Sequence, residues 1–104
     1  MRAVDDTTFE REVLRSERAV IVDFTAPWCA PCRAIAPALE ELAEESGVDL
    51  VSLDVDDNPE TAARFGVLSL PTVILFESGE QRTTVVGVRP RAFFEEKLAP
   101  WLAA

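Results

Sequence analysis

Residues 24–33 read FTAPWCAPCR, and the expected fold follows from what flanks this stretch. Its first residue, Phe24, is the last residue of the run AVIVDF at 19–24, whose β-branched residues predict a buried strand. Apolar residues then recur at helical spacing over 35–42, and Gly47 is placed to end that helix. The two cysteines of the stretch are therefore expected where a strand turns into a helix.

The rest of the chain predicts further strands and helices in alternation. Thr7 and Glu10 have the spacing of a capping box at the start of a first helix. Asn58 and Pro59 suit the N-cap and first position of a short helix, and residues 78–79 are Ser-Gly, which indicates a hairpin turn. The remaining expected elements are strands at 2–4, 48–55, 72–76 and 82–86 and a last helix at 91–102.

This order of elements predicts one α/β domain over residues 1–104. Strands joined through helices pair in parallel, whereas the hairpin adds antiparallel pairs. We therefore expect a mixed central β-sheet of four to five strands, flanked by helices on both faces. The length of 104 residues suits a single domain, and no linker or repeat interrupts the chain.

The composition excludes several kinds of site. Histidine is absent, which excludes Ser-His-Asp and Cys-His catalysis, and two cysteines cannot complete a four-cysteine metal site in a monomer. The acids Asp54 and Asp56, with Asn58, imitate the start of a calcium loop. However, Pro59 and Phe65 stand where glycine and a bidentate acid are needed, so we expect a solvated turn and no metal.

The charge and the hydropathy of the chain disfavour nucleic acids and membranes as partners. The net charge is −9, which disfavours nucleic-acid binding, and only one of the ten basic residues is lysine, so no polybasic membrane patch forms. No apolar run is long enough to span a bilayer, and residues 1–6 do not resemble a signal peptide. We expect a soluble, cytoplasmic monomer.

The cysteine pair carries the chemistry. Backbone N–H groups and the dipole at a helix N-terminus favour an anion, so the pKa of Cys29 should be lowered and Cys29 should be the nucleophile. Cys32 should be more shielded and placed to resolve a mixed disulfide, while Pro31 fits the first helical turn. The alternatives are two packing residues, half of an intermolecular metal site, or a structural disulfide, whose very small loop would add little stability.

Residues 28–32, WCAPC, resemble the active site of the thioredoxin family, and the similarity extends over essentially the whole chain. The other matching positions are 22–24, 56–59, 70–72, Gly79 and Gly87. The resemblance implies the thioredoxin fold, a redox-active Cys29–Cys32 disulfide and reduction of protein disulfides. It also implies that no cofactor is bound, and that electrons for redox homeostasis come from a flavin-containing, NADPH-dependent thioredoxin reductase.

The resemblance also implies roles for further residues. Asp23 interrupts an apolar strand, so burial should raise its pKa, and the family makes it the acid/base that assists Cys32; a solvated strand end is the alternative. Pro71 resembles the family's cis-proline, and the backbone of the residue before it could pair with an extended substrate. The expected substrate-binding residues are Trp28, Ala30, Pro31, Leu70, Pro71, Val86 and Gly87.

Three residues depart from the family pattern. Ala30 replaces the usual glycine. Alanine stabilises a helical turn by up to ~1 kcal/mol relative to glycine. The two residues between the cysteines help to set the reduction potential in this family. Thr25 stands where a second tryptophan is usual. Ser52 stands where a lysine commonly lies near the buried acid, and losing that ammonium should push the pKa of Asp23 higher.

Three other functions compete with disulfide reduction. The same cysteines could work as an oxidase or isomerase, which would need a destabilised disulfide and usually an oxidising compartment. The fold could serve as a non-catalytic docking or chaperone module, although the presence of both cysteines, Asp23 and Pro71 argues against that. A dimer could bind metal through two C-x-x-C pairs.

Overall fold

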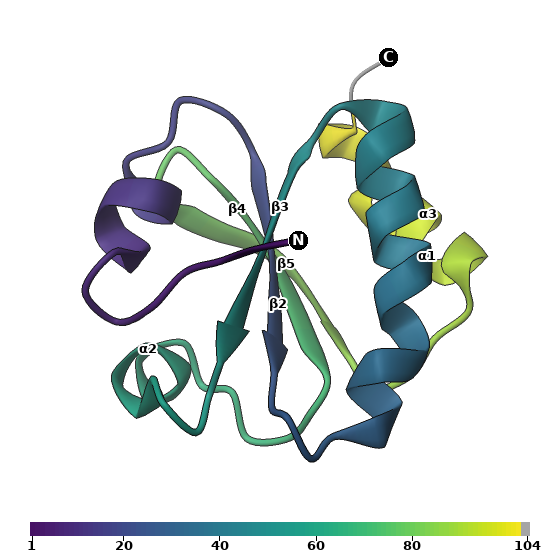
Figure 1. Ribbon diagram of the computed structural model, residues 1–104. Coiled ribbons are helices and arrows are strands. Elements are labelled where there is room, and N and C mark those ends of the chain that lie inside the picture. The colour runs from purple at the N-terminus through teal and green to yellow at the C-terminus, as the bar shows by residue number, and fades with distance from the viewer. Residues whose placement is uncertain (103–104) are drawn as a thin grey trace.

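The predicted strands form one mixed sheet in the computed structural model, which describes residues 1–102 (Figure 1). Its strands are β1 (Arg2–Ala3), β2 (Val20–Thr25), β3 (Asp49–Asp54), β4 (Thr72–Glu77) and β5 (Glu80–Val86). The helices are α1 (Ala30–Ser46), α2 (Pro59–Arg64) and α3 (Arg91–Leu98), with a short π-helix, η1 (Glu10–Leu14), and a 3-10 turn, η2 (Ala99–Trp101).

The sheet combines parallel and antiparallel pairs, as expected. Among the described residues it has five strands in the order β1-β3-β2-β4-β5; β3 pairs in parallel with β1 and β2, and β4 pairs antiparallel with β2 and β5. Ser78 and Gly79 both have positive φ, 53° and 76°, which is the backbone of a type I′ hairpin turn. A Cβ on Gly79 would lie 3.0 Å from the carbonyl oxygen of Leu14, so this position needs glycine.

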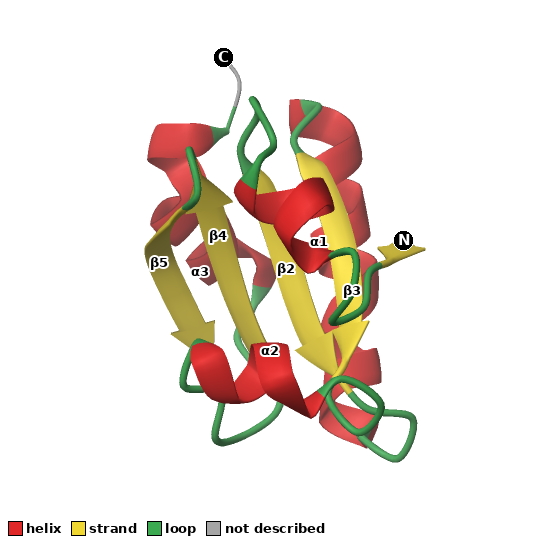
Figure 2. Cartoon of the chain, turned by 90° about the vertical axis from the view of Figure 1, so that its left-hand side faces the viewer, coloured by secondary structure: helices red, strands yellow, loops and turns green. Residues whose placement is uncertain are grey.

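Helices cover both faces of the sheet, which confirms the predicted architecture. Figures 1 and 2 show α1 and α3 on one face and η1 with α2 on the other. The sheet therefore separates two hydrophobic clusters. The cluster on the η1 side contains Val4, Phe9, Val13, Val20, Val22, Phe24, Val51, Leu53, Ile74 and Phe76. The cluster on the α1 side contains Ile21, Ile35, Leu39, Leu42, Val73, Leu75, Val85, Phe94 and Leu98.

Helix α1 begins and ends where the sequence predicts. Cys29 is its N-cap, and Gly47, at φ 75°, ends it by donating its N–H to the carbonyl of Ala43 at 2.8 Å.

No helix within residues 1–102 is long and apolar enough to cross a membrane.

The predicted capping box at Thr7 and Glu10 is wrong by two residues. The carboxylate of Asp5 accepts hydrogen bonds from the N–H groups of Thr7 and Thr8 at 2.8 and 2.9 Å, and the Thr8 hydroxyl accepts the N–H of Asp5 at 2.9 Å. The reciprocal pair is therefore Asp5 and Thr8, and it precedes the short η1. An aspartate serves as the N-terminal acceptor because its carboxylate takes several donors at once.

The predicted N-cap and first position of α2 are confirmed at Asn58 and Pro59, although the Asn58 side chain makes no cap hydrogen bond. Asn58 occupies the N-cap position, but its amide donates to the carbonyl of Asp54 and its Oδ1 accepts the N–H of Asp6. The carboxylate of Asp6 instead accepts the N–H groups of Glu60 and Thr61, and the Thr61 hydroxyl. A residue 55 positions earlier in the chain therefore caps this helix.

Candidate active site

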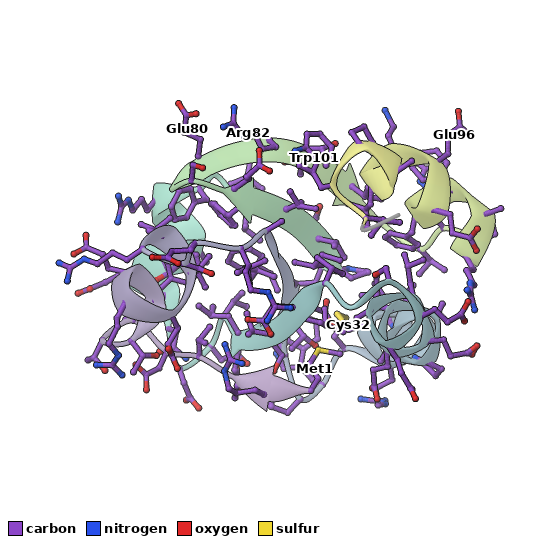
Figure 3. All side chains as sticks on the ribbon, turned by 90° about the horizontal axis from the view of Figure 1, so that it is seen from above. Met1, Cys32, Glu80, Arg82, Glu96 and Trp101 are labelled. Carbon is purple, nitrogen blue, oxygen red and sulfur yellow. A yellow bond between two sulfur atoms is a disulfide. The ribbon has the colours of Figure 1, made fainter. Side chains whose placement is uncertain are left out.

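The cysteine pair lies at one end of the sheet, where β2 connects to α1. Figure 1 shows the connection from α2 to β4 at the same end. Cys29 and Cys32 form a disulfide with their Cα atoms 5.3 Å apart, and Figure 3 shows the side chain of Cys32, a residue of α1, on the side of the helix that faces the sheet. The pair therefore lies at the strand-to-helix turn where the sequence predicts it.

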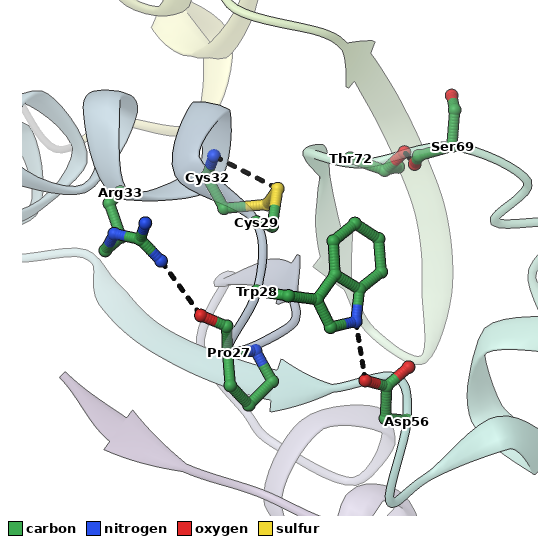
Figure 4. Close-up of a disulfide and its surroundings, with 8 residues drawn as sticks. All are labelled: Pro27, Trp28, Cys29, Cys32, Arg33, Asp56, Ser69 and Thr72. Carbon is green, nitrogen blue, oxygen red and sulfur yellow. Dashed lines mark hydrogen bonds between the residues drawn. A yellow bond between two sulfur atoms is a disulfide. The ribbon is translucent and has the colours of Figure 1, made fainter.

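The two sulfurs differ in hydrogen bonding rather than in exposure. Cys29 Sγ accepts the backbone N–H of Cys32 at 3.2 Å, as Figure 4 shows, in the first turn of α1. Both cysteines are 2% exposed, so the expectation that Cys32 is the more shielded is wrong for the disulfide form. Both sulfurs pack into one small cluster with Ala26, against Val55 and Leu70. The N–H donor and the helix dipole identify Cys29 as the sulfur best placed to carry negative charge.

Asp23 is buried, as the sequence predicts, and one of its carboxylate oxygens lacks a hydrogen-bond partner among the described residues. It is 3% exposed, and its Oδ1 finds no hydrogen-bond partner within residues 1–102. Side chains alternate along a strand, so Asp23 shares the α1 side of β2 with Ile21. Burial raises the pKa of Asp23 to about 7, and the charge of Glu40 on α1 adds to the effect.

Ser52 lies directly opposite Asp23 in the register of β2 and β3. The position where the family commonly has a lysine is thus filled by a hydroxyl-bearing residue beside the buried acid. No ammonium is available from this position to stabilise the Asp23 carboxylate, which agrees with the raised pKa.

Trp28 lies beside the disulfide, and a hydrogen bond to Asp56 fixes its indole ring. Its indole N–H donates to Asp56 Oδ2 at 2.7 Å, and Figure 4 places the ring between the cysteines and that carboxylate. Trp28 is 67% exposed. From the first turn of α1, the Arg33 guanidinium donates to the carbonyl of Pro27, on the same loop as Trp28, at 2.9 Å. A large apolar surface is therefore fixed next to the reacting sulfurs.

The segment before β4 completes the site. The Leu70–Pro71 peptide bond is cis, as the resemblance implies, and Leu70 packs against the cysteine cluster. The Pro71 carbonyl accepts the N–H of Gly87 at 2.8 Å, which joins Gly87 to this segment, and the half-exposed Val86 pairs with Thr72. Ala30 and Pro31, the first two residues of α1, are exposed.

The site contains sulfur, carboxylate and apolar groups but offers little to a metal. No group of three or more cysteine, aspartate or glutamate side chains within residues 1–102 is arranged to hold a metal ion. The acids after β3 have other partners: Asp56 N–H donates to Asp54 Oδ1, and the Asp56 carboxylate binds Trp28. What the arrangement can do is transfer electrons between disulfides.

Comparison with known proteins identifies the family. Residues 1–100 match the family model described as Thioredoxin. The chain belongs to the thioredoxin family. As a member of this family with its cysteine pair in place, it is a thiol–disulfide oxidoreductase acting on protein disulfides.

Several thioredoxins are similar over most of their length. A thioredoxin of Streptomyces clavuligerus is 50% identical over 93 residues, which cover 88% of this chain and 87% of the relative. A thioredoxin of Listeria monocytogenes is 46% identical over 98 residues, 92% and 93% of the two chains. A chloroplastic M-type thioredoxin of Pisum sativum is 40% identical over 104 residues, 98% of this chain and 60% of the relative.

Three residues of this thioredoxin site were missed in the sequence. Val55 packs against the cysteine cluster, Asp56 binds Trp28, and Leu68 is 97% exposed on the segment that leads to Leu70. Asp56 was expected in a solvated turn and within the 56–59 match to the family, but with no role at the site. The available signal for Leu68 was an apolar residue in the short loop before β4. The Trp28–Asp56 hydrogen bond joins positions 28 residues apart, so no local pattern predicts it.

Proposed function

We propose that this thioredoxin reduces protein disulfides, with Cys29 as nucleophile and Cys32 as resolving thiol. The hydrogen bond from the Cys32 N–H to Cys29 Sγ, at the N-terminus of the 17-residue α1, carries the assignment. A backbone donor and a helix dipole directed at one sulfur favour its thiolate over its thiol.

In the first step, the Cys29 thiolate attacks one sulfur of a substrate disulfide. The substrate S–S bond breaks, a mixed disulfide forms, and one substrate sulfur leaves as a thiolate that takes a proton from solvent. The apolar surroundings of the cysteine cluster, Ala26, Val55 and Leu70, limit access of water to the mixed disulfide.

In the second step, Cys32 attacks Cys29 Sγ. The Cys32 thiol first gives its proton toward the Asp23 carboxylate, whose raised pKa of about 7 suits proton transfer near neutral pH. The mixed disulfide breaks, the second substrate sulfur leaves and is protonated, and the Cys29–Cys32 disulfide forms. Two electrons have passed from the cysteine pair to the substrate.

Substrates are proposed to dock on an apolar surface around Cys29. Its proposed members are Trp28, Ala30, Pro31, Leu70, Pro71, Val86 and Gly87, of which Pro71 is buried and the others are partly or fully exposed. Among the hydrogen bonds of residues 1–102, none uses the backbone N–H or carbonyl of Leu70, so both are available to pair with an extended substrate strand.

A reductase of the family restores the dithiol. We propose a flavin-containing, NADPH-dependent thioredoxin reductase as electron donor, with no cofactor bound by this chain itself, in a cytoplasmic monomer. Sedimentation of the purified protein and fractionation of its source cells test the last two points directly.

Insulin reduction, coupled to NADPH oxidation through a thioredoxin reductase, tests the proposed function. Wild-type protein should support steady NADPH oxidation, and Cys29→Ser should abolish it. Cys32→Ser should accumulate a mixed disulfide with substrate, detectable by mass spectrometry. Equal rates for wild type and Cys29→Ser would overturn the proposal, and a reduction potential near about −120 mV would assign the chain to the oxidants instead.

A further inference from the structure

Leu68 stands out among the apolar side chains of the molecule. It is 97% exposed, the most exposed of the large hydrophobic residues among those described, on the segment between α2 and β4. A single exposed leucine needs no explanation by itself. This one lines a hollow beside the cysteine pair, together with Trp28, Val55, Val67, Ser69 and Leu70.

The walls of this hollow are held in place. The Trp28 indole is bonded to Asp56 at 2.7 Å. Val67 donates its N–H to the carbonyl of Ala62 at 2.9 Å and packs, with Val55, against the core. The hollow holds about 200 Å³, enough for one large side chain, and its lining is mostly apolar. It is therefore preformed to receive an apolar group rather than closed by its own side chains.

The hollow is continuous with the reacting sulfurs. Val55 and Leu70 line it and also pack against Cys29 and Cys32. A substrate strand that pairs with the Leu70 backbone and brings its sulfur to Cys29 would lie next to this hollow, because Leu70 lines it. A side chain close to the substrate cysteine would then be within reach of the hollow.

The negative charge of the protein favours basic over acidic residues next to that apolar side chain in the substrate. The chain carries 19 acidic and ten basic residues, and the carboxylate of Asp56 stands at the tryptophan wall. A cationic residue beside the apolar one is attracted to this surface, whereas an acidic one is repelled.

We propose that Leu68 is a specificity-determining residue: the hollow takes a leucine-sized apolar side chain next to the substrate cysteine, in a segment that carries lysine or arginine. The proposal rests on the proposed function and names the substrate class of the same site. Leu68 acts by contacting the bound side chain at the lining of the hollow, so it affects binding of the substrate and not the exchange step.

The test uses peptides with one intramolecular disulfide and a single variable residue beside the attacked cysteine, either leucine or serine. A second pair of peptides exchanges a neighbouring lysine for glutamate. In the reductase-coupled assay, wild-type kcat/KM should be about tenfold higher for the leucine peptide than for the serine peptide. The lysine peptide should exceed the glutamate peptide several-fold at low salt, and the difference should shrink as salt is added.

Variants at two exposed positions isolate the effect. Leu68→Ser should reduce the leucine-to-serine ratio to about twofold, mainly through KM, because the exposed side chain covers only the bound substrate. Val88→Ser is the matched control, since Val88 is 54% exposed and does not line the hollow. Its ratio should equal that of wild type.

Three outcomes would overturn the specificity proposal. The first is equal kcat/KM for the leucine and serine peptides with wild type, and the second is an unchanged ratio in Leu68→Ser. The third is equal kcat/KM for the lysine and glutamate peptides at low salt. Insulin reduction by the same preparations separates this result from the proposed function: if insulin is reduced and the peptide ratio is flat, only the specificity proposal fails.

Discussion

Replacing Asp23 by asparagine should remove a pH-dependent loss of stability from the oxidised protein. Asp23 is buried and lacks a partner for Oδ1 within the described part of the chain. Its pKa is about 7 in the folded protein against an ordinary value of 3.8. Between these values the unfolded chain has released the proton and the folded chain still binds it, so folding stability falls as pH rises.

The magnitude follows from the difference between the two pKa values. At about 1.4 kcal/mol per unit, the complete loss across the window is about 4 kcal/mol, and the part between about pH 5 and pH 8 is about 2.5 kcal/mol. Above about pH 7.5 both states are ionised, and the effect is constant. An asparagine side chain cannot ionise, so the Asp23→Asn variant should become more stable than wild type by an increasing amount as pH rises through this window.

Urea denaturation with the disulfide intact, followed by tryptophan fluorescence, measures this difference. The urea midpoint of Asp23→Asn minus that of wild type should grow by about 1 M or more from about pH 5 to pH 8. Asp57→Asn, on the exposed turn after β3, is the control and should follow wild type. A midpoint difference for Asp23→Asn that stays constant with pH would refute the assignment of a raised pKa to buried Asp23.

Three further predictions concern packing, backbone and the site. Gly79→Ala should destabilise the fold by about 1–3 kcal/mol in urea titrations, because φ is 76° and the new Cβ would lie 3.0 Å from the Leu14 carbonyl oxygen; an unchanged midpoint would contradict this. Leu39→Ala, at a fully buried α1 position, should cost about 2–5 kcal/mol by the same measurement, and a cost below about 1 kcal/mol would mean that the site collapses around the smaller side chain. Asp56→Ala should release the Trp28 indole and lower kcat/KM for insulin about fivefold, through KM; an unaltered KM would show that the bond does not position the ring.

Local patterns were sufficient for the elements that depend on neighbouring residues. The β-branched run at 19–24 gave a strand buried on both faces, and Gly47 ended α1 through its left-handed backbone. The turn at 78–79 was predictable from Gly79, which adopts positive φ without steric cost, although Ser78 also has positive φ. Each of these signals lies within a few residues of the structure it produces.

Contacts between distant segments could not be predicted from local patterns. Asn58 has the right residue type for a cap, yet Asp6 caps α2 because the N-terminal segment brings a charged acceptor to the same amides. Asp56 resembles an ordinary turn acid until the fold brings Trp28 within 2.7 Å. The burial of Asp23 was predictable from its apolar neighbours, whereas the contribution of Glu40 depends on how α1 lies across the sheet.

The cap that Asp6 provides makes α2 dependent on the start of the chain. During synthesis, residues 1–6 emerge before residues 59–64, so the Asp6 carboxylate is already available when α2 forms. Two amide protons, those of Glu60 and Thr61, therefore report whether β1 has paired with β3. Hydrogen exchange at these two amides would reveal detachment of β1, although the amides lie more than 50 residues away from that strand in the sequence.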